Sequence, residues 1–205
     1  MSPLQQSFFA RNTITVAQEL VGCVLQVVGD DGGEVSGRIV EVEAYGGVDD
    51  PASHAANGRT PRSEIMFGPP GFAYVYIIYG MHHCLNFVTE VEGTAGAVLI
   101  RGMEPIVGRE LMAVRRGLDP ETARDRDLCS GPGRLCQALG IDRRWNGLPL
   151  VSDLNDSVSS GAGQIRIFHG EGPPGGPAAT PRIGIRQAVD RLHRFIDPGN
   201  DCLSG

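Results

Sequence analysis

The stretch Tyr74–Asn86, which reads YVYIIYGMHHCLN, predicts the β-hairpin around which the rest of the chain is arranged. Tyrosine, valine and isoleucine favour strands, and a glycine between two such runs is typical of a tight turn. We expect strands over 73–79 and 82–89, joined at Gly80. Tyr79 then lies beside the tip, where an aromatic ring is difficult to bury. A projecting ring at this place fits insertion between stacked bases better than it fits a hydrophobic core.

A second strand is predicted upstream, over 35–45. Alternation along a strand places Glu41, Glu43 and Tyr45 on one face. On base rates, two carboxylates in this pattern form an acidic edge that faces solvent. Because an aromatic ring shares their face, we favour a pocket wall in which one carboxylate activates water as a general base.

The remaining elements are predicted from capping residues, turn residues and hydrophobic runs. They are a helix over 14–21 capped by Thr13, strands over 23–28, 95–102, 164–168 and 182–186, and helices over 108–116 and from Ser130 to Leu139. Residues 155–181 are rich in Gly, Pro and Ser and indicate a surface excursion. The expected fold class is mixed α/β (α+β), with a single compact domain over 1–205, a curved antiparallel β-sheet core, peripheral helices and a protruding β-hairpin.

Length and composition restrict the class of protein. The chain has 205 residues, of which 41% are hydrophobic, and no apolar run approaches the roughly 20 residues that span a bilayer. The first residues form neither a basic nor an apolar signal region. Five cysteines, an odd number at wide spacings, do not form a disulfide framework. We therefore expect a cytoplasmic protein with no membrane partner.

The charge pattern bears on both partner and mechanism. A net charge of -6 argues against a nonspecific DNA coat protein, although arginines are concentrated in the middle of the chain. Arg59 and Arg62 lie in that region and are candidates for phosphate contacts. All 18 basic residues are arginine. Schiff-base chemistry at a lysine is therefore unavailable, and a bond-breaking enzyme of this sequence should use water as its nucleophile.

Three further residues attract attention. His54 lies on a short turn opened by Asp50-Pro51. A surface histidine and a residue of a functional site explain it about equally well. Arg101 ends an apolar run, and a buried arginine needs an acidic partner, for which Glu43 or Glu104 is available. His82-His83-Cys84 looks like a metal cluster. However, neighbours on a strand point to opposite faces, and zinc ligands usually pair at C-x2-C spacings, so we expect no metal.

Taken together, these residues resemble the 3-methyladenine (alkyladenine) DNA glycosylase family of the methylpurine type. The resemblance covers nearly the whole chain, because long motifs follow one another in the family's order. The matching segments are Ser7–Arg11, Ile39–Tyr45, the position of His54, Thr60–Arg62 with Met66-Phe67, Tyr74–Met81, Cys84–Asn86, Leu99–Arg101, Glu104-Pro105 and Leu128–Leu139.

The resemblance implies a monofunctional glycosylase that flips a damaged purine out of duplex DNA and hydrolyses its N-glycosidic bond. By correspondence of motifs, Glu43 activates the water and Arg101 helps to hold it. A backbone carbonyl in the late Arg-Ile-Gly-Ile segment, from Ile185, contacts the same water. No cofactor or metal is implied. The implied partner is double-stranded DNA containing damaged purines, bound by a monomer.

The same resemblance assigns a base pocket and a DNA-contacting tip. Tyr45, Tyr76 and His54 enclose the flipped base, and Asn86 crowds the amino group of normal guanine. Tyr79 fills the gap left in the duplex, with Met81 beside it. A cationic alkylated purine between two tyrosine rings gains about 0.5–2 kcal/mol. The sequence does not rank 3-methyladenine, 7-methylguanine, ethenoadenine and hypoxanthine as substrates.

Two other classes of function are compatible with parts of the sequence. One is a module that recognises damaged DNA without cutting it, although an intact Glu43 and Arg101 argue against lost catalysis. The other is a metal-dependent hydrolase that uses Glu41, Glu43, His82 and Cys84, which the strand geometry disfavours. Release of free purine distinguishes the enzyme from the binding module, and full activity in a chelator excludes the metal-dependent enzyme.

Overall fold

Strand β2 (Glu34–Tyr45) is the central element of the computed structural model, which describes residues 2–150 and 161–205. Its first residues pair with β1 and its residues 41–43 pair with β8, while β5 follows it along most of its length. The pairing with β5 shifts register near Val40 and Glu41. This irregularity lets one strand serve two different neighbours on its other side.

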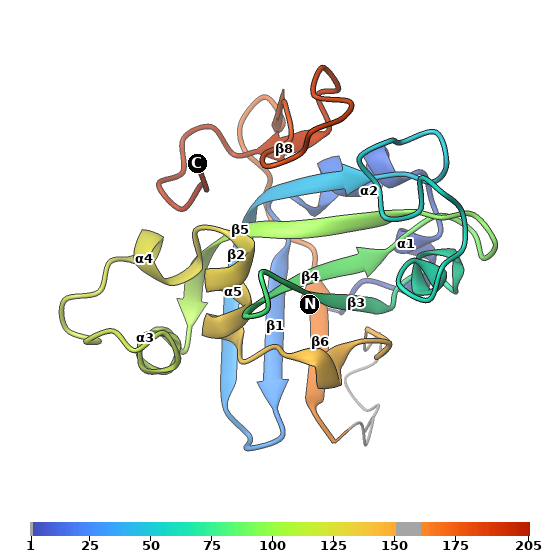
Figure 1. Ribbon diagram of the computed structural model, residues 1–205. Coiled ribbons are helices and arrows are strands. Elements are labelled where there is room, and N and C mark those ends of the chain that lie inside the picture. The colour runs from blue at the N-terminus through green and yellow to red at the C-terminus, as the bar shows by residue number, and fades with distance from the viewer. Residues whose placement is uncertain (1, 151–160) are drawn as a thin grey trace.

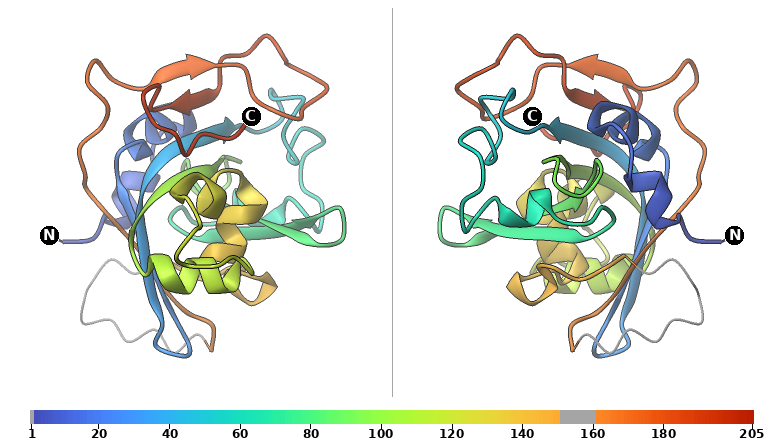
Figure 2. Two further views of the ribbon diagram at one scale, coloured as in Figure 1. Left: turned by 90° about the vertical axis from the view of Figure 1, so that its left-hand side faces the viewer. Right: turned by 90° about the vertical axis from the view of Figure 1, so that its right-hand side faces the viewer.

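Within these residues, the strands form one antiparallel sheet of eight strands in the order β3-β4-β5-β2-β1-β6, to which β8 adds beside β2 and β7 beside β8 (Figure 1). The strands are β1 Val24–Gly29, β2, β3 Ala73–Ile78, β4 His82–Val88, β5 Ala97–Val107, β6 Gly163–Phe168, β7 Ala178–Thr180 and β8 Arg194–Ile196. The sheet is strongly curled, and its β3–β4 edge extends as a hairpin (Figure 2). The expected mixed α/β class with a curved antiparallel sheet is confirmed.

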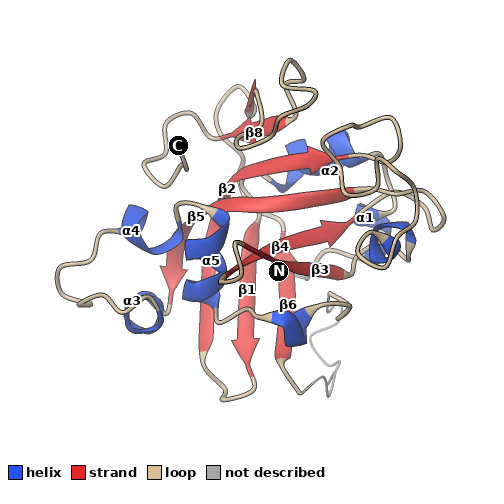
Figure 3. Cartoon of the chain, viewed as in Figure 1, coloured by secondary structure: helices blue, strands red, loops and turns tan. Residues whose placement is uncertain are grey.

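Short helices cover both faces of the curled sheet (Figure 3). Helix α5 packs on β4 and β5 and contacts α3 and α4, whereas α2 packs on β2 and β5. One large core joins these elements, with Trp145, Phe9 and Phe87 among its bulkiest fully buried side chains. The helices are α1 Gln6–Phe9, α2 Thr13–Leu20, α3 Arg109–Arg115, α4 Asp125–Cys129 and α5 Pro132–Leu139, with 3-10 turns η1 Glu64–Phe67 and η2 Arg143–Trp145.

The predicted strand over 182–186 is wrong. This segment forms a loop, because the Arg182 side chain turns inward to the buried carboxylate of Asp50 and Gly184 has a φ of +75°. A positive φ is incompatible with a continuous extended strand. The C-terminal strand is instead β8, which starts at Arg194.

Two other expectations need correction. The cap of α2 is Asn12, whose side chain accepts from the amides of Ile14 and Thr15. Thr13 is buried and bonds to Thr89 and Glu90 instead. The surface excursion expected over 155–181 includes residues 155–160, which lie outside the described part of the chain. Farther along, the strand expected over 164–168 is confirmed as β6.

In residues 2–150 and 161–205, no helix combines the length and the apolar character that crossing a bilayer requires.

Stability should depend on the β1–β2 core rather than on exposed apolar side chains. Leu25 is the second residue of β1 and has no exposed surface. Leu25→Ala should lower the free energy of unfolding by about 2–5 kcal/mol, because a cavity is left in a packed core. The matched substitution Leu192→Ala, at a side chain that is 51% exposed, should change it by less than about 0.5 kcal/mol. Urea denaturation of both variants measures the difference, and equal losses would contradict this view of the core.

Candidate active site

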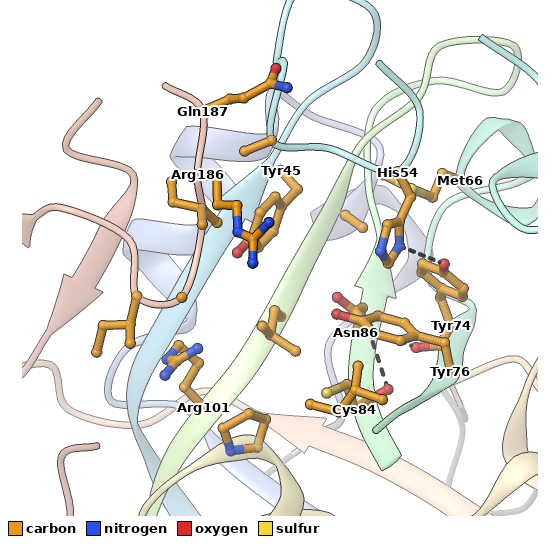
Figure 4. A pocket seen from close by; sticks show the side chains of 18 of the residues that line it. Tyr45, His54, Met66, Tyr74, Tyr76, Cys84, Asn86, Arg101, Arg186 and Gln187 are labelled. Atoms are coloured by element: carbon orange, nitrogen blue, oxygen red, sulfur yellow. Dashed lines mark hydrogen bonds between the residues drawn. The ribbon is translucent and has the colours of Figure 1, made fainter. Parts of the chain in front are cut away.

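A cavity of about 500 Å³ opens between β2, the β3–β4 hairpin and the loop over 183–187 (Figure 4). This volume is in the range of small-molecule sites. The lining residues are Tyr45, Pro51, Ala52, His54, Met66, Tyr74, Tyr76, Ile78, Tyr79, Cys84, Asn86, Ala97, Leu99, Arg101, Pro132 and Ile183–Gln187. Most of the residues predicted for a base pocket are therefore neighbours in the fold.

Aromatic rings form two opposite walls of this cavity. Tyr45 extends from the end of β2 on one side, and Tyr76 extends from β3 on the other, next to His54 (Figure 4). The His54 and Tyr76 rings meet edge to face, with centroids 4.7 Å apart. A flat ring that enters between the walls can stack on Tyr45 and Tyr76.

His54 is held as a neutral ring. Its Nδ1 lies 2.9 Å from the Tyr74 hydroxyl, which fixes the orientation of the imidazole. Burial, together with the positive charge of Arg62, lowers the pKa of His54 from 6.5 to about 4. At neutral pH the ring therefore offers one nitrogen as a hydrogen-bond acceptor or donor without adding positive charge.

Glu43 lies directly behind the cavity wall with no exposed surface. Its Oε2 accepts from the Tyr45 hydroxyl at 2.7 Å and from Arg101 Nη1 at 3.3 Å. Its Oε1 accepts from the backbone amide of Ile183 at 2.7 Å. Because Tyr45, Arg101 and Ile183 all line the cavity, the carboxylate is separated from it only by groups that it binds.

Glu41 is equally buried but is saturated by other groups. It accepts from Arg101 Nε at 3.0 Å and from Arg194 Nε at 2.6 Å. Arg101 therefore bridges both glutamates of β2, and the two carboxylates raise its pKa against the opposing effect of burial. Of the two acidic partners considered for Arg101, Glu43 is confirmed, whereas Glu104 pairs with Arg38. The acidic edge facing solvent is not formed either.

The loop over 182–187 is pinned behind Tyr45. Arg182 donates to both oxygens of Asp50 and to the backbone carbonyl of Ala44. Its guanidinium carbon lies 4.7 Å from the centroid of the Tyr45 ring. The Tyr45 ring is thus in contact with a cation that does not itself line the cavity. Ile185 lines the cavity, as does Ile183, whose amide contacts Glu43.

Asn86 is fixed in one orientation on β4. It is buried, and its Nδ2 donates to the backbone carbonyls of Tyr74 at 3.0 Å and Cys84 at 3.4 Å. Burial raises the pKa of the neighbouring Cys84 thiol to about 11, so the sulfur that lines the cavity is protonated. This wall is therefore rigid and uncharged.

The hairpin tip projects into solvent. Tyr79 is 89% exposed and Met81 is 69% exposed. Tyr79 has a φ of +52° and Gly80 a φ of +71°, and the turn closes with a bond from the Met81 amide to the Ile78 carbonyl. A bulky residue in the left-handed region is uncommon and costs on the order of 1 kcal/mol. The surrounding hairpin thus holds an exposed aromatic residue in an unfavourable backbone conformation.

Arg59 and Arg62 lie on the exposed turn beside the cavity. Arg59 pairs with Glu64 at 2.6 Å and lies over the Phe67 ring. The Arg62 guanidinium lies 5.0 Å from the centroid of Tyr76. In the free protein both arginines are therefore partly engaged by neighbouring side chains.

The metal-dependent hydrolase was the disfavoured alternative, with Glu41, Glu43, His82 and Cys84 as its ligands. Among the described residues, no group of three or more His, Cys, Asp or Glu side chains is arranged to hold a metal ion. Glu41 and Glu43 face arginines instead.

Several lining residues were missed in the sequence. Tyr74 shares a strand face with Tyr76, so its alternation was a usable signal. Met66 comes from the short 3-10 turn η1, and Arg186 and Gln187 come from a loop. No periodicity indicates where the side chains of such segments point.

Comparison with known proteins identifies the family of the chain. The sequence profile described as methylpurine-DNA glycosylase matches residues 7–201. A relative from Rhodopseudomonas palustris (strain HaA2) is 50% identical over 202 residues, which are 98% of this chain and 90% of the relative. A relative from Burkholderia lata is 45% identical, over 98% of this chain and 91% of the relative. A relative from Koribacter versatilis is 43% identical, over 100% of this chain and 94% of the relative. All three are named as candidate 3-methyladenine DNA glycosylases. The chain belongs to the methylpurine-DNA glycosylase family.

Proposed function

We propose that this protein is a monofunctional DNA glycosylase of base excision repair, which hydrolyses the N-glycosidic bond of alkylated purines in double-stranded DNA. The observation that carries this proposal is a buried Glu43 held by Arg101 directly behind a cavity with tyrosine walls. The names of the relatives support the same substrate class. Deaminated and etheno purines are further substrates to be tested.

The damaged nucleotide leaves the duplex before reaction, because groups that line a cavity of about 500 Å³ cannot reach a base inside the stack. Extrusion costs a few kcal/mol, and least for a lesion that pairs poorly. In the cavity the base stacks on Tyr45 and Tyr76, and neutral His54 completes the wall. The fixed amide of Asn86 crowds the amino group that distinguishes normal guanine.

Bond breaking places positive charge on the sugar, which a nearby carboxylate stabilises. In the proposed reaction Glu43 accepts a proton from water, the water oxygen bonds to C1′, and the glycosidic electron pair leaves with the base. Arg101 and the Ile183–Ile185 backbone orient the water and the carboxylate. The product is free purine and an abasic site. No lysine is present to form a Schiff base that would cut the strand.

Tyr79 is proposed to fill the space that the extruded nucleotide leaves, with Met81 beside it. Their exposure and the positive φ of Tyr79 support this role, since a strained, exposed aromatic residue is rarely retained for packing alone. Arg59 and Arg62 are proposed to contact flanking phosphates, exchanging their present partners for DNA.

Glu43→Gln should abolish base release while lesion binding stays within a few-fold of wild type. A glutamine keeps the size of the side chain but cannot accept the proton of water. The loss should reach at least about 10²-fold, as for removal of a general base. Single-turnover release from duplexes that each carry one lesion, in EDTA, measures it. Glu19→Gln, at an exposed pair with Arg11, is the control. An active Glu43→Gln enzyme would remove Glu43 from the mechanism.

Tyr79→Ala should weaken binding of a lesion-containing duplex by about 1–3 kcal/mol, the contribution of one base-stacking contact. Tyr79→Phe keeps the ring and should bind like wild type. Fluorescence anisotropy titrations at one fixed salt concentration compare the three proteins. Unchanged affinity for the alanine variant would show that the tip is not a wedge.

His54 should make the folded protein sensitive to acid. Its pKa is about 4 in the folded protein, whereas a free histidine titrates near 6.5. Between these values the unfolded chain binds more protons, so folded stability falls as the pH is lowered through this window. When the pH is lowered from 7 to 4.5, the melting temperature of His54→Gln should fall by less than that of wild type. His82→Gln, on the exposed hairpin, should follow wild type. Equal acid sensitivity of all three would show that His54 is not held neutral.

A further inference from the structure

The C-terminal tail reaches the charged cluster behind the cavity. The backbone amide of Ser204 donates to Glu41 Oε2 at 2.6 Å, and its hydroxyl donates to Glu41 Oε1 at 2.8 Å. The same hydroxyl oxygen accepts from Arg101 Nη2 at 3.0 Å. Ser204 therefore contacts both members of the Glu41–Arg101 pair, although it is 163 residues from Glu41 in the chain.

These contacts divide the Arg101 guanidinium into two edges. Nε and Nη2 face Glu41 and Ser204, while Nη1 faces Glu43. The contacts of Nε and Nη2 fix the plane of the guanidinium, and Nη1 donates a hydrogen bond to the proposed general base, Glu43. A carboxylate alone holds an arginine by one or two bonds about which it can still tilt. The serine hydroxyl supplies the additional contact that defines the tilt.

The tail is attached firmly enough to perform this task. Ser130 Oγ donates to the backbone carbonyl of Leu203 at 2.6 Å, and Arg194 Nη2 donates to that of Ser204 at 2.9 Å. Gly102 makes the approach possible, because a Cβ at this position would lie 2.8 Å from the backbone oxygen of Cys202. The tail thus lies between β5, β8 and the start of α5.

We infer that Ser204 is a positioning residue for hydrolysis, acting through the orientation of Arg101 on Glu43. This inference rests on the proposed glycosylase function. Ser204 itself does not line the cavity and contacts no substrate. Its loss should therefore slow the chemical step and leave binding of the lesion unchanged, because reacting groups lose rate when their geometry is displaced by a fraction of an ångström.

Ser204→Ala keeps the backbone bond to Glu41 and removes only the hydroxyl. We expect the single-turnover rate constant at saturating enzyme to fall about 10-fold, with lesion affinity within two-fold of wild type. Ser204→Thr, which retains a hydroxyl, should restore the rate to within about three-fold. Thr180→Val is the matched control, because the Thr180 hydroxyl bonds to Arg194 in the same cluster but not to Arg101. It should behave like wild type.

The outcomes separate this inference from the proposed function. No base release by wild type overturns the proposed function, whatever the variants do. Active wild type with an equally fast Ser204→Ala overturns the role of Ser204, as does an equal loss of affinity and rate. Melting curves accompany each assay. If Ser204→Ala does not fold, Ser204→Cys repeats the test with a weakly bonding thiol of similar size, and wild-type rate in that variant overturns the inference.

Discussion

Two carboxylates on one face of β2 are buried completely, and this constraint organises the surrounding structure. An unpaired buried charge costs several kcal/mol, so Glu41 and Glu43 require cations and hydrogen-bond donors around them. Arg101 of β5 serves both, and Arg194 of β8 serves Glu41. The pairing of β2 with β5 and β8 is therefore stabilised by these ion pairs as well as by the backbone hydrogen bonds between the strands.

The same arrangement separates two roles for chemically identical side chains. Glu41 is saturated by arginines and by the tail, which makes it an anchor. Glu43 is held by Tyr45, Arg101 and the Ile183 amide, all at the boundary of the cavity. A shift of two residues along one strand thus distinguishes a structural carboxylate from one suited to chemistry. Tyr45 connects Glu43 to the cavity, since its hydroxyl binds Glu43 and its ring forms part of the cavity wall.

The sequence was sufficient wherever short-range periodicity determines structure. The hairpin around Gly80, the shared face of Glu43 and Tyr45, and the burial of Arg101 follow from alternation and from apolar runs. The pairing of Arg182 with Asp50 and that of Ser204 with Glu41 join positions 132 and 163 residues apart, which no local pattern encodes. Strand β8 was also missed, because its three residues are too few for an alternating pattern to be recognised. Among the residues proposed for the site, Tyr45, Tyr76 and Asn86 lie on strands, where alternation indicates the direction of each side chain. Ile185 lies on the 182–187 loop, where no such pattern exists.

The cation behind Tyr45 affects how a charged base can be distinguished from a neutral one. The Arg182 guanidinium lies over one face of the Tyr45 ring and is fixed there by Asp50, so the π electrons of this ring already face a positive charge. A positively charged base on the free face shares that electron density and gains less than it would from an uncovered ring. For the proposed substrates, we therefore expect binding in the cavity to favour a charged base over a neutral one by less than two uncovered rings would. In the proposed reaction, the positive charge also makes the base a better leaving group, so we expect charged and neutral bases to differ in the rate at which the glycosidic bond breaks.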